Sequence, residues 1–210
     1  MINILIADDH ELIREGLKKI LKKEADMEVL GEARNAQEVF DQVKNRNVNI
    51  VLLDISMPGL SGLDVLTELR QNYPKLPVLI LSMHPEDRFA VRALKAGAAG
   101  YVTKDSAVSE LVKAIRKVVT GSKYVSVRLA EKLADELEKG NEKPPHEMLS
   151  DREFQVMRMV AAGKKISEIA EELSLSISTV NTYRTRILEK MQMETNVELT
   201  RYAIENHLIE

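Results

Sequence analysis

Two kinds of apolar pattern alternate through the first 121 residues of the chain. Short runs in which almost every residue is apolar are typical of parallel β-strands covered on both faces. Between these runs, apolar residues recur at the three- and four-residue spacing of amphipathic helices. The runs that predict strands are INILIA (2–7), MEVLGEA (27–33), NIVLLD (49–54), PVLILS (77–82) and AGYVTK (99–104). Five such β–α units predict an α/β domain built on a five-stranded, doubly wound parallel sheet.

The pattern changes after Gly121 and Ser122. An amphipathic helix is expected over 128–139, and the following GNEKPPHE (140–147) holds two prolines that cannot continue it. Beyond Leu149 the strand-like runs cease. The apolar spacing then fits helices over 151–162, 166–173, 177–192 and 195–207. We therefore expect a first domain over 1–121, a linker with a short helix over 122–147, and a small all-α domain over 148–210.

Composition narrows the class of protein. A chain of 210 residues suits two domains, and 44% hydrophobic with 30% charged residues suits a folded protein with a charged surface. The net charge of −3 means that any nucleic-acid site must be a local patch. The chain has no cysteine, which excludes disulfides and thiol catalysis and suits a reducing compartment. With neither a signal-peptide pattern nor an apolar run long enough to span a membrane, we expect a cytoplasmic protein with no membrane partner.

Polar side chains follow four of the five expected strands. They are Asp8 and Asp9 after the first strand, Asp54 at the end of the third, Ser82 after the fourth and Lys104 after the fifth. Ligands of doubly wound sheets bind beyond these strand ends. Three converging carboxylates repel one another, and Mg²⁺, which prefers oxygen ligands, removes the conflict. Because a lysine suits a phosphoryl oxygen and a carboxylate can act as nucleophile, the pattern predicts phosphoryl transfer to Asp54.

Each of these residues also has an ordinary structural explanation. A single aspartate after a strand is usually a turn or cap residue, and Asp8 and Asp9 could cap the helix that starts near Glu11. A lone serine is uninformative, and a lone lysine is most often solvated. Their combination at four strand ends favours the functional interpretation.

Other functions remain as alternatives to a phosphorylated regulator. A phosphatase of the haloacid dehalogenase type would need a second aspartate where this chain has Ser56. A nucleotide-binding enzyme would need a glycine-rich loop after the first strand, and ADDHELIREG contains none. A regulator that works without phosphorylation would not need Asp54 opposite Lys104.

The histidines do not predict a competing site. They lie in different segments without metal-ligand spacing, at His10, His84, His146 and His207. We expect His10 to be a loop or cap residue beside the acidic pocket.

Residues 1–121 resemble the receiver domain of two-component response regulators, on the motifs ADDH, LLDISMPGLSG, LS and YVTK. The resemblance implies that Asp54 is the phospho-acceptor. It also implies that Asp8, Asp9, Asp54 and the backbone carbonyl of Ser56 hold Mg²⁺.

The same resemblance assigns roles on the last two strands. Ser82 and Tyr101 take the hydroxyl and aromatic switch positions, and Lys104 takes the position of the family's lysine. Ser82 stands where threonine is commoner, which preserves the hydroxyl. Asp105 follows Lys104 where many members have a proline with a cis peptide bond.

Residues 149–191 predict a helix-turn-helix. Ser150 and Glu153 fit a capping box, Gly163 fits a helix end, and Ser176 fits the N-cap of the next helix. In that helix an apolar stripe is expected to face inward, formed by Val180, Ile187, Leu188 and Met191. The other side chains suit contacts in a DNA major groove. The candidates are Thr179, Asn181, Thr182, Tyr183, Arg184, Thr185 and Arg186.

A generic helical bundle is the alternative for this segment. Residues 149–210 hold 8 Lys and Arg against 10 Asp and Glu, which is not a basic domain. The acidic residues nevertheless avoid the stretch between Leu175 and Leu188, which contains two arginines. The local charge therefore favours DNA binding.

The C-terminal segment resembles the LuxR-type helix-turn-helix, on LSDRE, AAGKKISEIAEELSLSISTV and ILEKM. With the receiver-like part, the whole chain resembles the NarL/FixJ class of response regulators. Asn181 and Tyr183 stand where most members have Lys and His, and TVNTYRTRILEKM looks closer to the GacA, UvrY and BvgA-type branch. The resemblance implies a phosphorylation-activated transcription factor rather than an enzyme. Its implied partners are a sensor histidine kinase, double-stranded DNA, RNA polymerase and, when phosphorylated, a second copy of the chain.

Overall fold

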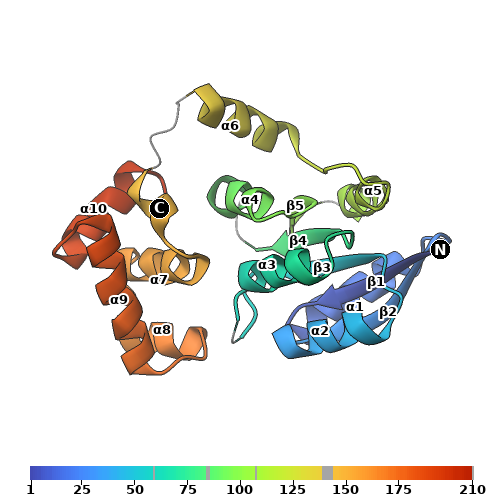
Figure 1. Ribbon diagram of the computed structural model, residues 1–210, viewed down its shortest axis with the longest axis horizontal. Coiled ribbons are helices and arrows are strands. Elements are labelled where there is room, and N and C mark those ends of the chain that lie inside the picture. Colours follow the sequence, from blue (N-terminus) through green and yellow to red (C-terminus); the bar gives the residue numbers. More distant parts are fainter. Residues whose placement is uncertain (59, 84–85, 107, 139–143, 210) are drawn as a thin grey trace. The chain divides into compact units, whose positions relative to one another are not determined.

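The computed structural model describes residues 1–58, 60–83, 86–106, 108–138 and 144–209. Its chain divides into two compact units, Met1–Glu138 and Lys139–Glu210 (Figure 1). Residues 139–143 of the expected linker, Gly59 of the turn after the third strand, and His84 lie outside the described residues. Among the helices described, none has the length and apolar character that crossing a membrane requires.

The first unit is built on one parallel sheet. Its strands are β1 (Ile2–Ala7), β2 (Met27–Ala33), β3 (Ile50–Asp54), β4 (Val78–Ser82) and β5 (Gly100–Thr103). They pair in the order β2-β1-β3-β4-β5, and every pairing is parallel. This arrangement places β3 in the centre of the sheet and confirms the predicted five-stranded, doubly wound fold.

Helices cover both faces of this sheet, and the side chains of the central strands alternate between the two faces. The helices are α1 (Glu11–Leu21), α2 (Ala36–Asn45), α3 (Gly62–Asn72), α4 (Glu86–Lys95) and α5 (Val108–Val119). On one face Ile4, Ile6 and Leu52 pack with apolar side chains of α1 and α5. The helices α2, α3 and α4 contact the sheet through its other face. Every residue of β3 and β4 is buried, which explains their continuous apolar sequences.

After α5 the chain returns along the outer edge of β5. Tyr124 forms an isolated parallel β-bridge with Gly100. The two segments lie so close that a Cβ added at Gly100 would be 2.8 Å from the carbonyl oxygen of Tyr124. The hydroxyl of Ser126 then donates a hydrogen bond to the carboxylate of Glu86 at the start of α4. The next helix, α6 (Val127–Glu138), packs against α4. The sheet-containing unit therefore extends beyond α5 to the end of α6.

The second unit is helical in all its described elements. They are the 3₁₀ helix η1 (Pro145–Met148), α7 (Asp151–Ala161), α8 (Ile166–Glu172), α9 (Ile177–Met191) and α10 (Asn196–Glu205). Ser150 and Glu153 form the predicted capping box at α7, and Ser176 caps α9 by accepting a hydrogen bond from the backbone N–H of Thr179. Gly163, with φ of 82°, follows the end of α7. These features confirm the predicted small all-α domain with a helix-turn-helix at α8 and α9.

Candidate functional site

The ends of the central strands bring the expected polar side chains to one edge of the sheet. Asp54 is the last residue of β3, and Asp8 follows β1, its neighbour in the sheet. Lys104 follows β5, and its backbone N–H donates to the carbonyl oxygen of Ser82, 2.8 Å away. The parallel topology therefore assembles this site from residues far apart in the sequence.

Lys104 bridges two buried carboxylates. Its Nζ lies 2.7 Å from Oδ2 of Asp8 and 2.9 Å from Oδ2 of Asp54. The side chains of both aspartates are 2% exposed and that of Lys104 is 4% exposed. Oδ1 of Asp54 is also buried. The lysine thus holds one oxygen of this carboxylate, and the backbone of Ser56 also hydrogen-bonds to the carboxylate.

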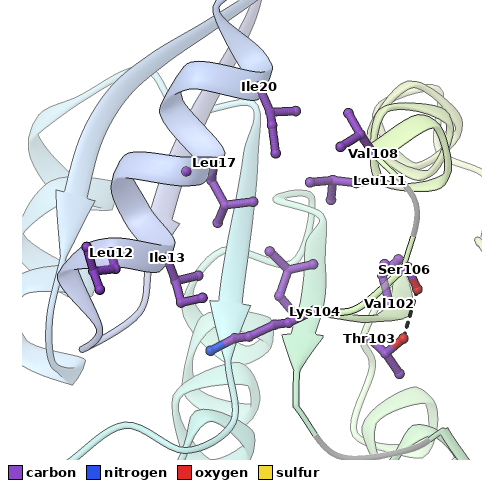
Figure 2. A pocket seen from close by; sticks show the side chains of 12 residues that line it. Leu12, Ile13, Leu17, Ile20, Val102, Thr103, Lys104, Ser106, Val108 and Leu111 are labelled. Atoms are coloured by element: carbon purple, nitrogen blue, oxygen red, sulfur yellow. Dashed lines mark hydrogen bonds between the residues drawn. The ribbon is translucent and has the colours of Figure 1, made fainter.

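The side chain of Lys104 lines a mostly apolar hollow between α1 and α5. Figure 2 shows the side chain of Lys104 extending towards α1, with its nitrogen on the side of Ile13. The lining is mostly apolar and includes Leu17 and Leu111. The aliphatic part of Lys104 therefore packs among hydrocarbon side chains while its charged end reaches the acidic pocket.

Burial and charge act in opposite directions on the ionisable groups of the site. Burial raises the pKa of Asp54 above its ordinary value; Lys104 counteracts this, and the charge of Asp8 raises the pKa further. Burial alone would lower the pKa of Lys104, but Asp54 and Asp8 outweigh it, so that the net pKa is raised. Lys104 thus stays charged. One lysine does not balance the charge of two buried carboxylates, so a second cation would lower the energetic cost of burying them.

The pocket has the donor set that a divalent cation requires. Four side chains each bring one possible ligand atom into a cluster in which all the atoms lie within 4.8 Å of one another: those of Asp8, Asp9, His10 and Asp54. Asp9 is 31% exposed, so the outer side of the pocket is open to water. Mg²⁺ takes carboxylate oxygens and keeps several waters. The three carboxylates and the open side near Asp9 fit that ion.

The turn after β3 keeps the carboxylate of Asp54 at the edge of the sheet. The chain folds back so closely that a Cβ added at Gly62 would lie 2.0 Å from the carbonyl oxygen of Asp54. The N–H of Gly62 donates to the carbonyl oxygen of Ile55 at 2.9 Å, and Ser61 caps α3. Ser56, the expected carbonyl ligand, lies half-buried in this turn. Gly62, the last residue of the motif LLDISMPGLSG, therefore allows this turn to pack closely against Asp54.

The two expected switch residues are both buried. Ser82 and Tyr101 are each 0% exposed, on the neighbouring strands β4 and β5. Tyr101 pairs with Ile80 in the sheet. Because neighbouring residues of a strand face opposite sides and Val102 packs on the α1 and α5 side, Tyr101 faces the side covered by α4. Lys104 is followed by a trans peptide bond, since the described residues contain no cis peptide.

Helix α9 presents part of the expected DNA-contacting set to solvent. Val180, Ile187 and Met191 are buried as predicted, and Leu188 is half-buried. The exposed candidates are Asn181, Thr182, Thr185 and Arg186, whereas Thr179, Tyr183 and Arg184 are half-buried. Nε of Arg184 donates to Oδ1 of Asn196 on α10 at 2.7 Å, so this arginine is also part of the domain's own packing.

The fold and the site define the chain as a two-component response regulator with a LuxR-type DNA-binding domain, a class that regulates transcription under the control of phosphorylation. Residues 4–116 match the family of response regulator receiver domains, and residues 147–203 match the luxR family of bacterial regulatory proteins. The chain belongs to this family of regulators. It is 38% identical to the response regulator UvrY of Escherichia coli strain K12 over 209 residues, 99% of this chain and 96% of UvrY. It is 36% identical to the response regulator GacA of Pseudomonas protegens over 210 residues, 100% of this chain and 99% of GacA.

Solved structures share the same architecture. RcsB of Salmonella enterica serovar Typhimurium, bound to promoter rprA in the presence of the phosphomimetic BeF₃⁻, has a TM-score of 0.66 and 26% identity. That match covers 96% of this chain and 97% of the RcsB chain. A LuxR-family response regulator from Aurantimonas sp. SI85-9A1 has a TM-score of 0.60 and 34% identity, over 64% of this chain and 96% of that one. The RcsB match, which covers nearly the whole chain, confirms the two-part fold.

Proposed function

We propose that Asp54 is the phospho-acceptor of this response regulator. The observation that carries the proposal is the buried carboxylate of Asp54 at the end of β3, 2.9 Å from the ammonium group of Lys104. A carboxylate oxygen of Asp54 attacks the phosphorus atom of the donor, forms a P–O bond and displaces the donor group. With a sensor histidine kinase as the donor, the bond that breaks is the P–N bond of its phosphohistidine. Lys104 then pairs with an oxygen of the transferred phosphoryl group.

Magnesium is the ion that we assign to the acidic pocket. Asp8, Asp9 and Asp54 would hold it with the backbone carbonyl of Ser56. When bound, Mg²⁺ neutralises the charge that gathers between the carboxylates and the phosphoryl oxygens. Lys104 and Asp8 keep Asp54 fixed at the edge of the sheet, so the nucleophile needs no rearrangement before the reaction.

The switch that we propose starts at Ser82. Phosphorylation adds about two negative charges and three acceptor oxygens beside its hydroxyl. Ser82 would turn towards the phosphoryl group, and Tyr101 would follow into the space on the α4 side of β5. Helix α4 packs on β5 and against α6, so a change at this face reaches the segment that leads out of the receiver unit.

The output that we propose is binding of α9 in the major groove of double-stranded DNA. Asn181, Thr182 and Thr185 form a short polar surface near its N-terminal half, with Arg186 exposed beside them. Thr179, Tyr183 and Arg184 lie at the border of this surface. We further infer a homodimer of the phosphorylated protein on paired half-sites, contacts to RNA polymerase, and a cytoplasmic location. The chain would act as a regulator rather than as an enzyme, since its phosphoryl chemistry modifies its own Asp54.

Phosphorylation of the purified full chain tests the acceptor assignment. Incubation with acetyl phosphate and Mg²⁺ should add one phosphoryl group, detected by intact-mass spectrometry. Asp54→Ala should accept none, and Asp9→Asn should accept it slowly because the ion is held less well. Asp41→Ala, which removes an exposed carboxylate of α2, is the matched control and should be labelled like the unaltered protein. Labelling that persists in Asp54→Ala would overturn the proposal.

A further inference from the structure

The imidazole of His10 lies against the acidic pocket. Its Nδ1 is 2.9 Å from Oδ1 of Asp9 and 3.3 Å from Oδ1 of Asp8. The backbone contributes to this placement, because the N–H of His10 donates to Oδ1 of Asp8 at 2.9 Å. The ring itself is 63% exposed and lies on the open side of the pocket.

These spacings match the edges of a metal coordination shell. Neighbouring ligands held about 2.1 Å from an octahedral ion lie about 3 Å apart. Tetrahedral ligands at the same ion distance lie roughly 3.4 Å apart. Nδ1 of His10 and Oδ1 of Asp8 and of Asp9 therefore stand at separations that one ion can bridge with little movement.

The two sides of the pocket are chemically different. Lys104 approaches the Oδ2 atoms of Asp8 and Asp54. The buried carboxylate of Asp54 belongs to the set of carboxylates that His10 joins. A cation in this set would thus meet up to three carboxylate oxygens and one ring nitrogen.

We propose that His10 is a nitrogen ligand through which the pocket that we assign to Mg²⁺ also binds divalent transition-metal ions such as Co²⁺ or Ni²⁺. Mg²⁺ uses oxygen ligands and waters and gains little from an imidazole. Ions later in the first transition series bind imidazole progressively better. His10 therefore sets the selectivity of the pocket among divalent ions. The inference rests on the proposed function only in placing the ion at the same pocket.

Direct metal titration of the full chain tests this inference without measuring phosphorylation. Calorimetry gives the affinities for Co²⁺ and Mg²⁺, and the visible absorption of bound Co²⁺ reports nitrogen ligation. In His10→Asn we expect the affinity for Co²⁺ to fall roughly tenfold or more, the range seen when ligand environments are disrupted. The affinity for Mg²⁺ should change by no more than about twofold, because that ion depends on oxygen ligands. The Co²⁺ spectrum should shift as well.

The variants are chosen to preserve the fold. His10 is the N-cap residue of α1, and asparagine is among the best N-cap residues. His207→Asn is the matched control, because His207 is exposed and its φ of 55° suits asparagine. An unchanged Co²⁺ affinity and spectrum in His10→Asn would overturn the inference and leave the ring as an ion-pair partner of the two aspartates. An equal loss for Co²⁺ and Mg²⁺ would also overturn it. Labelling at Asp54 is measured separately, so failure of the proposed function would be recognised independently.

Discussion

The ammonium group of Lys104 lies 2.9 Å from Oδ2 of Asp54, and both side chains are almost completely buried. The pair joins the end of β5 to the end of β3, which are not neighbours in the sheet. The pair thus serves two roles: it supplies the counter-charge of Asp54, and it fixes the geometry of the strand ends.

Replacement of Lys104 should destabilise the receiver unit. In Lys104→Met, Asp8 and Asp54 lose their buried counter-charge, a kind of change that costs about 3–5 kcal/mol. Denaturant unfolding of the full chain should show this loss, and added Mg²⁺ should restore part of it because a second cation replaces the missing charge. Lys113→Met, at an exposed position of α5, is the control and should change little. Stability equal to that of the unaltered protein would show that the ion pair does not support the fold.

Gly62 should tolerate no side chain. Since its Cβ would meet the backbone oxygen of Asp54 at 2.0 Å, Gly62→Ala must move either β3 or α3. We expect a lower melting temperature and slower phosphorylation by acetyl phosphate. Gly16→Ala in α1 is the matched control, because a Cβ there meets nothing within 4 Å. That substitution should stabilise the protein by about 0.5–1 kcal/mol. Equal behaviour of the two variants would contradict the close packing at Asp54.

The two arginines of α9 should behave differently. Arg186 is exposed, so Arg186→Ala should weaken binding to all DNA sequences. The slope of log affinity against log salt concentration should become smaller by about one unit. Arg184 is bonded to Asn196, so Arg184→Ala should also lower the stability of the helical unit. Salt-dependent binding curves and thermal unfolding separate the two effects. If Arg186→Ala lowered the stability and Arg184→Ala changed only DNA binding, the roles assigned to the two arginines would be wrong.

Asn181 should contribute to sequence selectivity. It is exposed in the N-terminal half of α9, where recognition helices meet base edges. Asn181→Ala should relax the preference at one position of each half-site, by roughly 1–3 kcal/mol, and leave non-specific binding almost unchanged. Binding-site selection with the purified variant measures this, and an unaltered preferred sequence would exclude the role.

Acid should loosen the helical unit through Glu153. Burial raises the pKa of this carboxyl, but Lys190 and the backbone of Ser150 outweigh it and the net pKa is lowered from 4.5. Its contribution to stability is therefore complete above pH 4.5 and is lost as the pH falls below that value, through the lower pKa of the folded state. Amide hydrogen exchange in α7 and α9 should show this loss. Glu153→Gln should remove the dependence, whereas Glu171→Gln, at an exposed position, should retain it.

The sequence predicted those features that depend on local pattern or on topology. Buried parallel strands require apolar runs, and the carboxyl ends of parallel strands meet at one edge of the sheet. The sequence alone therefore places Asp54 and Lys104 close together. Contacts made by side chains across elements were not predictable in this way. The bond from Arg184 to Asn196 crosses the turn between two helices, and the bond from Ser126 to Glu86 joins the segment after α5 to the start of α4. Periodicity contains no information about either.

The bridge between Tyr124 and Gly100 has a practical consequence for chimeric regulators. The regular β–α pattern stops at Gly121, yet a graft cut there would leave the outer edge of β5 without its partner and α4 without α6. Uncovered strand edges promote self-association. Fusions that join this input module to a foreign output module should therefore retain residues through Glu138. In this protein the portable module ends with the helix that covers α4, not with the last helix of the β–α repeat.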